Sequence, residues 1–141
     1  MEEAKITESS SRATLTPFTV RFHEVDLLNV MWHGHYLKLF EDGREDFGRR
    51  LGLSYLDVFR EGYLTPVVDI QCSYKKSLGY GDQGIIETTF IPKVAAKLVF
   101  QYRIYLAETG ETIATGTSTQ VFLHKESREL QLTEPDFFAD W

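Results

Sequence analysis

The residue types best suited to chemistry gather between residues 20 and 36. Three of the four histidines fall within thirteen residues there, with one carboxylate among them: His23, Asp26, His33 and His35. A carboxylate can attack a carbonyl carbon or orient a water that does so, and backbone N–H groups at a helix start can polarise the carbonyl oxygen. Asp26 lies seven residues before His33, near which a helix is predicted to begin. The segment therefore offers a candidate nucleophile or base together with candidate donors.

Simpler roles for the same residues remain open. An aspartate ahead of a helix is commonly a turn former, although Asp26 lies too far before the predicted helix to be its N-cap. The side chain of His33 either orients water or substrate, or packs against the neighbouring Trp32. His35 is expected to be an exposed helix residue and Asn29 a turn residue. A zinc site is disfavoured, because His33 and His35 would point about 200° apart on a helix. We predict no bound metal and no cofactor.

The helix that would position this segment is predicted to begin near His33 and to end at Leu51. Its length is about 18 residues, or ~27 Å. Its apolar residues recur at spacings of three and four, which is typical of one buried helix face: Tyr36, Phe40, Gly43, Phe47 and Leu51. Gly43 on that face predicts a close approach by a neighbouring backbone. A shorter helix is predicted over residues 55–60.

A period of two predicts five strands. The first carries Phe18, Val20 and Phe22, and the others cover residues 68–74, 86–90, 98–106 and 113–123. Short turns predict that the last four strands are antiparallel neighbours. The fold class is therefore α+β, with one long helix covering one face of an antiparallel sheet. Residues 1–14 are predicted to form a flexible N-terminal arm, and residues 15–141 a single domain.

The loop and the helix start resemble the signature of an enzyme family. Asp26-x-x-x-Val30-x-Trp32-His33-x-x-Tyr36-Leu37, followed by Phe40-Glu41, is similar to the motif of hotdog-fold acyl-CoA thioesterases of the 4-hydroxybenzoyl-CoA thioesterase and YbgC-like branch. Residues 20–22, 66–70 and 79–82 resemble the first strand, the second strand and the following turn of that family. The resemblance covers about residues 17–123 and implies an antiparallel sheet wrapped around one long central helix.

The sequence departs from the family pattern in three places. The family usually has glycine near Leu28 or Asn29, and it often has asparagine or arginine at His35. Some members carry a tyrosine where Phe22 stands. A role that depends on that tyrosine hydroxyl does not carry over to this chain.

The resemblance implies an acyl-CoA thioesterase that releases a free acid and coenzyme A. A thiol has a pKa of only about 8.5, so a thiolate leaves with little help from a general acid. Asp26 is then the nucleophile or base, while the backbone amide of His33 faces the carbonyl group. Substrate contacts are expected from Val30, Trp32 and Tyr36. The resemblance also implies a homodimer or homotetramer, with the site between two protomers.

Two other functions fit the same elements. A hydratase or dehydratase of this fold also uses an acid with a histidine, but its motif places them closer than the seven-residue step found here. A non-catalytic acyl-CoA or acyl-carrier-protein binding module would use Asp26 only as a structural residue. Activity on an enoyl-CoA would indicate the first, and binding without hydrolysis the second.

Composition narrows the classes further. Fifteen basic against twenty-one acidic residues give a net charge of −6, which argues against a nucleic-acid partner and against docking to an acidic carrier protein. Cys72 is the single cysteine, so no internal disulfide is possible, which suits a reducing compartment. It alternates with apolar residues and is expected in the core. The polar N-terminus and the lack of a long apolar run predict a cytoplasmic protein without a membrane partner.

Overall fold

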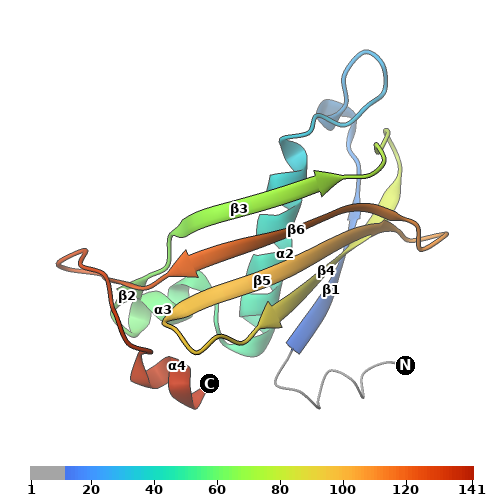
Figure 1. Ribbon diagram of the computed structural model, residues 1–141. Coiled ribbons are helices and arrows are strands. Elements are labelled where there is room, and N and C mark those ends of the chain that lie inside the picture. The colour runs from blue at the N-terminus through green and yellow to red at the C-terminus, as the bar shows by residue number, and fades with distance from the viewer. Residues whose placement is uncertain (1–11) are drawn as a thin grey trace.

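Five antiparallel strands form one sheet that curves around one long helix (Figure 1). The computed structural model describes residues 12–141. The strands follow the order β1-β4-β5-β6-β3 across the sheet. Their bounds are β1 Arg12–Thr19, β3 Val67–Tyr74, β4 Gln83–Ile91, β5 Lys97–Leu106 and β6 Thr112–Val121. The edges of the sheet are therefore β1 and β3.

Helix α2 (His35–Leu51) lies along one face of the sheet and confirms the predicted helix (Figure 1). Its buried residues include Phe40 and Phe47, each 0% exposed. Gly43 does lie at a close approach, but the neighbours are side chains of β4 rather than the predicted backbone: a Cβ there would lie 2.4 Å from the hydroxyl oxygen of Thr88 and 2.9 Å from Cγ2 of Ile86. On β6, Gly116 leaves room for the ring of Phe40 in the same way. The apolar period of three and four residues thus places the helix on the sheet.

The strand order differs from the prediction of four neighbouring strands. β3 and β4 are not paired; β3 pairs with β6, and β4 lies between β1 and β5. The connection over residues 75–82 crosses three strand spacings of about 4.8 Å each, which eight residues can span at roughly 3.3 Å per residue. The short connection was therefore compatible with a crossover as well as with a hairpin.

The N-terminal boundary also differs. Residues 12–14 belong to β1, paired with β4, rather than to an arm; the rest of the predicted arm lies outside the described residues. The first strand ends at Thr19, and Phe22 begins the 3-10 turn η1 (Phe22–Glu24) with 76% of its surface exposed. The strand ends before Phe22 because the chain turns there: the Glu24 amide donates to the Arg21 carbonyl at 3.0 Å.

Smaller elements close the lower end of the sheet in Figure 1. Helix α3 (Tyr55–Arg60) covers the predicted residues. Its N-cap is Ser54, which exchanges capping hydrogen bonds with Asp57. Strand β2 (Tyr63–Leu64) pairs with β7 (Leu123–His124). Helix α4 (Asp136–Asp140) brings Trp141 against Phe47 and Phe90. No helix within residues 12–141 is long and apolar enough to cross a membrane.

Candidate active site

The loop from Asp26 to Val30 is folded by the Asp26 carboxylate. Its Oδ1 accepts hydrogen bonds from the backbone N–H groups of Leu28 at 2.8 Å and Val30 at 3.1 Å. Asn29 has a φ of 62° and accepts a hydrogen bond from the Tyr80 amide, so it is the predicted turn residue. The turn-forming role of Asp26 is therefore real. It occupies only Oδ1, since no donor within residues 12–141 reaches Oδ2, and the side chain is exposed.

A backbone bridge brings the two ends of this loop together. Val25 and Met31 form an isolated antiparallel bridge, and the Trp32 amide donates to the Glu24 carbonyl at 3.2 Å. Met31 is buried, with 3% of its surface exposed, and its own amide donates to the Leu78 carbonyl. The strand end and the helix start are thus held side by side, so that Asp26 and His33 flank one bridge although seven positions separate them.

Two of the backbone N–H groups at the start of α2 have no acceptor within residues 12–141. The amides of His35, Tyr36 and Leu37 donate to the carbonyls of Trp32, His33 and Gly34. Within residues 12–141, the amides of His33 and Gly34 donate to no acceptor. The first turn holds no acidic side chain that would neutralise them. Together with the helix dipole, these two N–H groups can stabilise negative charge on a carbonyl oxygen.

Aromatic rings hold this helix start in place. The hydroxyl of Tyr74, at the end of β3, donates to the His33 carbonyl at 3.0 Å. The His33 ring lies 5.2 Å from the Trp32 ring and 6.2 Å from the Tyr74 ring, measured between centroids. The Trp32 ring lies over Gly34, where a Cβ would approach it to 2.2 Å. Sequence reasoning missed Tyr74, because it joins His33 only across 41 positions of the chain.

The three predicted substrate-contact residues lie in different surroundings. Val30 and Trp32 are exposed by 36% and 58%, so both can meet a ligand. Tyr36 is only 2% exposed, and burial raises the pKa of its hydroxyl. Its ring packs edge-on against Tyr74 at 5.1 Å. The structure therefore places Tyr36 in the core as a support for the helix start, where it does not meet solvent.

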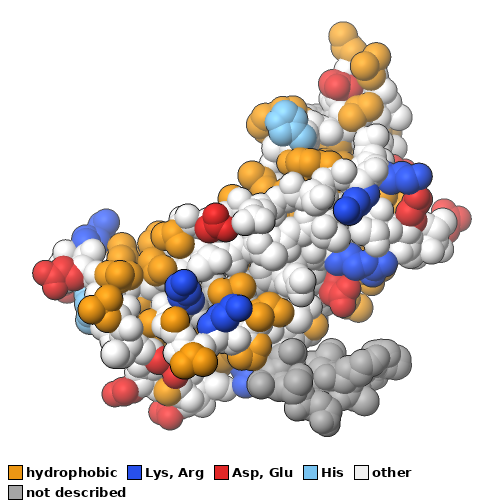
Figure 2. Space-filling view, in the orientation of Figure 1, with side chains coloured by type: hydrophobic (Ala, Val, Ile, Leu, Met, Phe, Trp, Pro, Cys, Tyr) orange, Lys and Arg blue, Asp and Glu red, His pale blue; other side chains and the backbone are white. Residues whose placement is uncertain are grey.

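Asp26 also borders a hollow at the tip of the molecule. This hollow of about 680 Å³ is lined by Asp26 together with apolar and aromatic side chains, among them Phe22, Leu27 and Tyr80. The loop projects beyond the sheet at the top of Figure 1, and its tip carries hydrophobic side chains in Figure 2. Leu27 and Leu28 are 103% and 81% exposed. An aspartate beside so much exposed apolar surface is typical of a site that a ligand or a partner covers.

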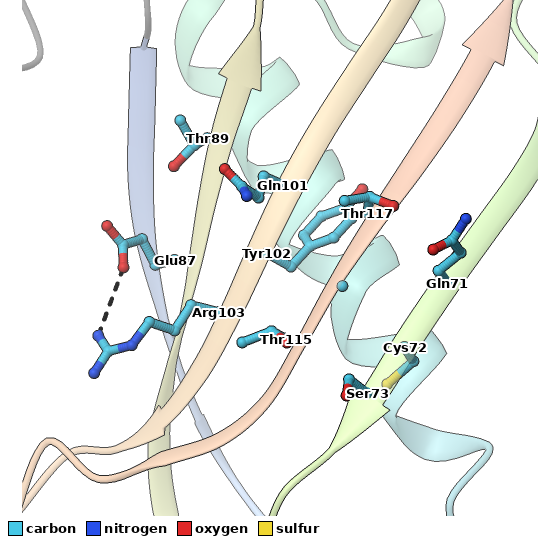
Figure 3. A pocket seen from close by; sticks show the side chains of 11 residues that line it. Gln71, Cys72, Ser73, Glu87, Thr89, Gln101, Tyr102, Arg103, Thr115 and Thr117 are labelled. Carbon is cyan, nitrogen blue, oxygen red and sulfur yellow. Dashed lines mark ion pairs between the residues drawn. The ribbon is translucent and has the colours of Figure 1, made fainter.

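A second hollow lies on the outer face of the sheet, away from α2 (Figure 3). It is lined largely by threonine and glutamine side chains, and Glu87 and Arg103 form an ion pair across it at 3.7 Å. Cys72 borders it; this residue is half-buried in the edge strand and packs against the core, and burial raises the pKa of its thiol. A thiol with a raised pKa is a poor nucleophile, so the chemistry does not centre there.

Comparison with known proteins decides the family. A model of the thioesterase-like superfamily matches residues 20–141. The chain belongs to that superfamily. A similar protein of Bacillus subtilis, named putative acyl-CoA thioesterase YneP, is 37% identical over 123 residues, which cover 86% of this chain and 87% of YneP.

Solved structures of thioesterases have the same fold. DHNA-CoA thioesterase from Staphylococcus aureus superposes with a TM-score of 0.79 at 30% identity, covering 92% of this chain and 85% of that one. A variant of 4-hydroxybenzoyl-CoA thioesterase bound to 4-hydroxybenzoyl-CoA gives a TM-score of 0.78 at 18% identity, covering 92% and 97%. The predicted hotdog fold and the predicted enzyme class, a thioester hydrolase, are confirmed for this superfamily member.

Proposed function

We propose that this thioesterase hydrolyses acyl-CoA esters with Asp26 as the reacting carboxylate and the start of α2 as the donor site. The proposal rests on groups without a hydrogen-bond partner among residues 12–141 on the two sides of the Val25–Met31 bridge. Oδ2 of Asp26 lies on one side, and the amides of His33 and Gly34 lie on the other. The coenzyme A ester is supported by relatives of this family whose names carry that substrate.

The reaction follows from these groups. The thioester oxygen accepts hydrogen bonds from the two amides, which makes the carbonyl carbon more electrophilic. Oδ2 of Asp26 then either attacks that carbon, giving an acyl anhydride that water cleaves, or takes a proton from the water that attacks. In both routes the carbon–sulfur bond breaks, coenzyme A leaves as a thiolate, and the acid is released. Oδ1 stays bound to the loop amides, which keeps the carboxylate oriented.

The site is proposed to be completed by a second copy of the chain. β3 is an edge strand whose outer side pairs with no strand of residues 12–141, and it carries exposed apolar side chains, Val68 at 58% and Val67 at 40%. The opposite edge is poorly suited to pairing, because β1 contains Pro17 and Arg50 already donates to the Leu15 carbonyl at 2.8 Å. Two β3 strands paired about a twofold axis would join two sheets into one.

A dimer of this kind would also cover the other exposed apolar groups. The loop with Leu27 and Leu28 lies beyond the end of β3, and α3 lies beside its start (Figure 1). An antiparallel pair of β3 strands therefore brings the loop of one copy toward α3 of the other, where Tyr55 and Leu56 are 59% and 60% exposed.

We also propose that the protein resides in the cytoplasm. The free thiol of Cys72 supports this location, because the cytoplasm keeps thiols reduced.

The proposal is tested by Asp26→Asn with a plain acyl-CoA and a thiol reagent. Asparagine keeps an oxygen that can accept from the loop amides, so the fold should persist while kcat falls about 10²- to 10⁴-fold. Asp42→Asn serves as the matched control, since Asp42 is an exposed helix carboxylate whose single ion-pair partner among residues 12–141 is Lys38 at 3.5 Å, and the kcat of this variant should not change. An Asp26→Asn enzyme with undiminished kcat would refute the assignment.

A further inference from the structure

An arginine near the middle of α2 lies in a cleft that the proposed reaction does not use. Arg44 is half-buried and donates from Nη1 to the hydroxyl of Tyr102 at 3.0 Å. That hydroxyl lies 2.6 Å from the Ser118 hydroxyl oxygen, and both Tyr102 and Ser118 are buried. The Tyr102 ring stacks on Phe40 at 4.3 Å. The guanidinium is therefore held at a defined position by the core of the protein.

Arg44 has donors left over. A guanidinium carries five N–H groups, and within residues 12–141 the Tyr102 hydroxyl is its single hydrogen-bond acceptor. No carboxylate of the described residues lies within ion-pairing distance, 4.0 Å, of it. A structural arginine at such a position normally has a carboxylate partner, as Arg50 has in Asp46. The free donors of Arg44 thus need an acceptor from outside the chain.

These donors face a cavity of suitable size. The cavity of about 390 Å³ lies between α2, α3 and the sheet. Its apolar lining includes Leu53, Val67 and Phe100, and Arg44 shares its polar lining with Glu41 and Glu45. At about 30 Å³ per small group, the volume holds roughly a dozen non-hydrogen atoms. Glu45 pairs with Arg49 at 3.5 Å, but Glu41 has no such partner within the described residues.

The twofold arrangement proposed above places this cavity beside the thioester site of the other copy. Val67, at the start of β3, lines the cavity, and Tyr74, at the end of β3, binds the His33 carbonyl. When two β3 strands pair antiparallel, the start of one lies opposite the end of the other. The cavity of one copy then faces the helix start of its partner.

We propose that the acyl group bound at Asp26 of one copy enters the Arg44 cavity of the second copy, and that Arg44 selects acyl groups with a hydroxyl at the far end. A hydroxyl accepts from Arg44 and donates to Glu41. A carboxylate would accept as well, but it would meet two glutamates in the same cavity. A plain hydrocarbon would leave the guanidinium donors that Tyr102 does not use desolvated and without an acceptor. The inference rests on the proposed function and the proposed dimer.

The first test compares three acyl-CoAs of equal chain length that end in methyl, hydroxyl or carboxylate. The wild-type enzyme should have the highest kcat/KM for the hydroxyl-ended ester. Arg44→Met should lower that value about 10- to 100-fold, as expected for loss of a charged hydrogen-bond partner, and should leave the methyl-ended ester within a few-fold. The matched control is Arg103→Met on the outer face of the sheet, where Arg103 pairs with Glu87 at 3.7 Å, and it should change neither.

The second test separates the two copies. Asp26→Asn and Arg44→Met chains are co-expressed with different tags, and mixed dimers are isolated through both tags. If Arg44 serves the site of the other copy, one site of each mixed dimer is intact, and about half of the wild-type activity on the hydroxyl-ended ester returns. If Arg44 serves its own chain, both sites are damaged and no activity returns.

The outcomes are distinguishable. Equal losses on all three esters in Arg44→Met, a wild-type preference for the carboxylate-ended ester, or no recovery in mixed dimers would each overturn this inference and leave thioester hydrolysis intact. A wild-type enzyme inactive on every acyl-CoA would instead overturn the proposed function.

Discussion

The two ends of helix α2 differ in how completely their backbone groups are satisfied. At the C-terminal end, Gly52 adopts a left-handed conformation with a φ of 77°, and the Trp141 indole donates to the Leu51 carbonyl at 2.6 Å. At the N-terminal end, the amides of His33 and Gly34 have no acceptor within the described residues. A helix end that is left unsatisfied at an exposed surface, in a chain that caps its other end so fully, is typical of a binding site.

Charge follows the same division. Arg49 and Arg50 occupy the last turn, where positive charge complements the helix dipole, and Arg50 pairs with Asp46. The first turn has no acidic residue, although an acid there would stabilise the helix. Charges that complement the helix dipole are therefore present in the last turn of α2 and absent from its first turn. The N-terminal end therefore keeps its positive potential available to a ligand.

Glycine-to-alanine substitutions at both ends of α2 test whether the N-terminal end serves activity and the C-terminal end serves stability. The larger effect is expected for Gly34→Ala. The new Cβ would lie 2.2 Å from the Trp32 ring, so the ring and the amides beside it must shift. We expect kcat/KM to fall about 10- to 100-fold, because displacements of about 1 Å in a catalytic geometry have such effects. The free energy of unfolding, measured with urea, should change little, since 58% of Trp32 is exposed.

Gly48→Ala is the counterpart in the last turn. Its Cβ would lie 2.7 Å from the Leu53 carbonyl oxygen and 2.8 Å from the Ser54 Cα, both backbone atoms that cannot rotate away. Urea unfolding should show a loss of about 1–3 kcal/mol, while kcat/KM per folded molecule stays unchanged. If instead Gly34→Ala lost stability and Gly48→Ala lost activity, the division between the two ends would be wrong.

A smaller effect is expected from the ion pair near the C-terminal end of α2, where Asp46 pairs with Arg50. Hydrogen bonds from Arg50, and then from Thr16, lower the pKa of Asp46 below its ordinary value of 3.8. Because the pKa is lower in the folded state, this interaction stabilises fully above pH 3.8 and is lost as the pH falls through the lower folded value. Arg50 is 48% exposed, so we expect only about half a kcal/mol after solvent screening.

The measurement is the free energy of unfolding of wild type and Asp46→Asn as a function of pH. The two should differ above pH 4, roughly, and converge in more acidic solution. The kcat/KM of Asp46→Asn at neutral pH should equal that of the wild type, because Asp46 serves the satisfied end of the helix. A difference that grows as the pH falls would contradict the assignment of the lowered pKa.

Most of the secondary structure was predictable because it depends on local spacing. The face shared by Phe40 and Phe47 predicted α2, and Gly43 predicted a close approach there, although the neighbour is the Thr88 side chain on β4 and not a backbone. The pairing of β3 with β6 was not predictable, because an eight-residue connection permits both a hairpin and a crossover. The extension of the first strand to Phe22 was wrong, because the Glu24 amide donates to the Arg21 carbonyl and folds residues 22–24 into a turn.

The helix, most of the strand segments and the loop with its aspartate follow from local sequence patterns, since periodicity and turn chemistry act between residues close in the chain. Two features became visible only in the folded chain: one carboxylate oxygen of Asp26 accepts hydrogen bonds from its own loop, and Tyr36 is buried. It also decided that Arg44 meets Tyr102, a contact across 58 positions. Such contacts depend on how the sheet closes around the helix, and no local pattern encodes that closure.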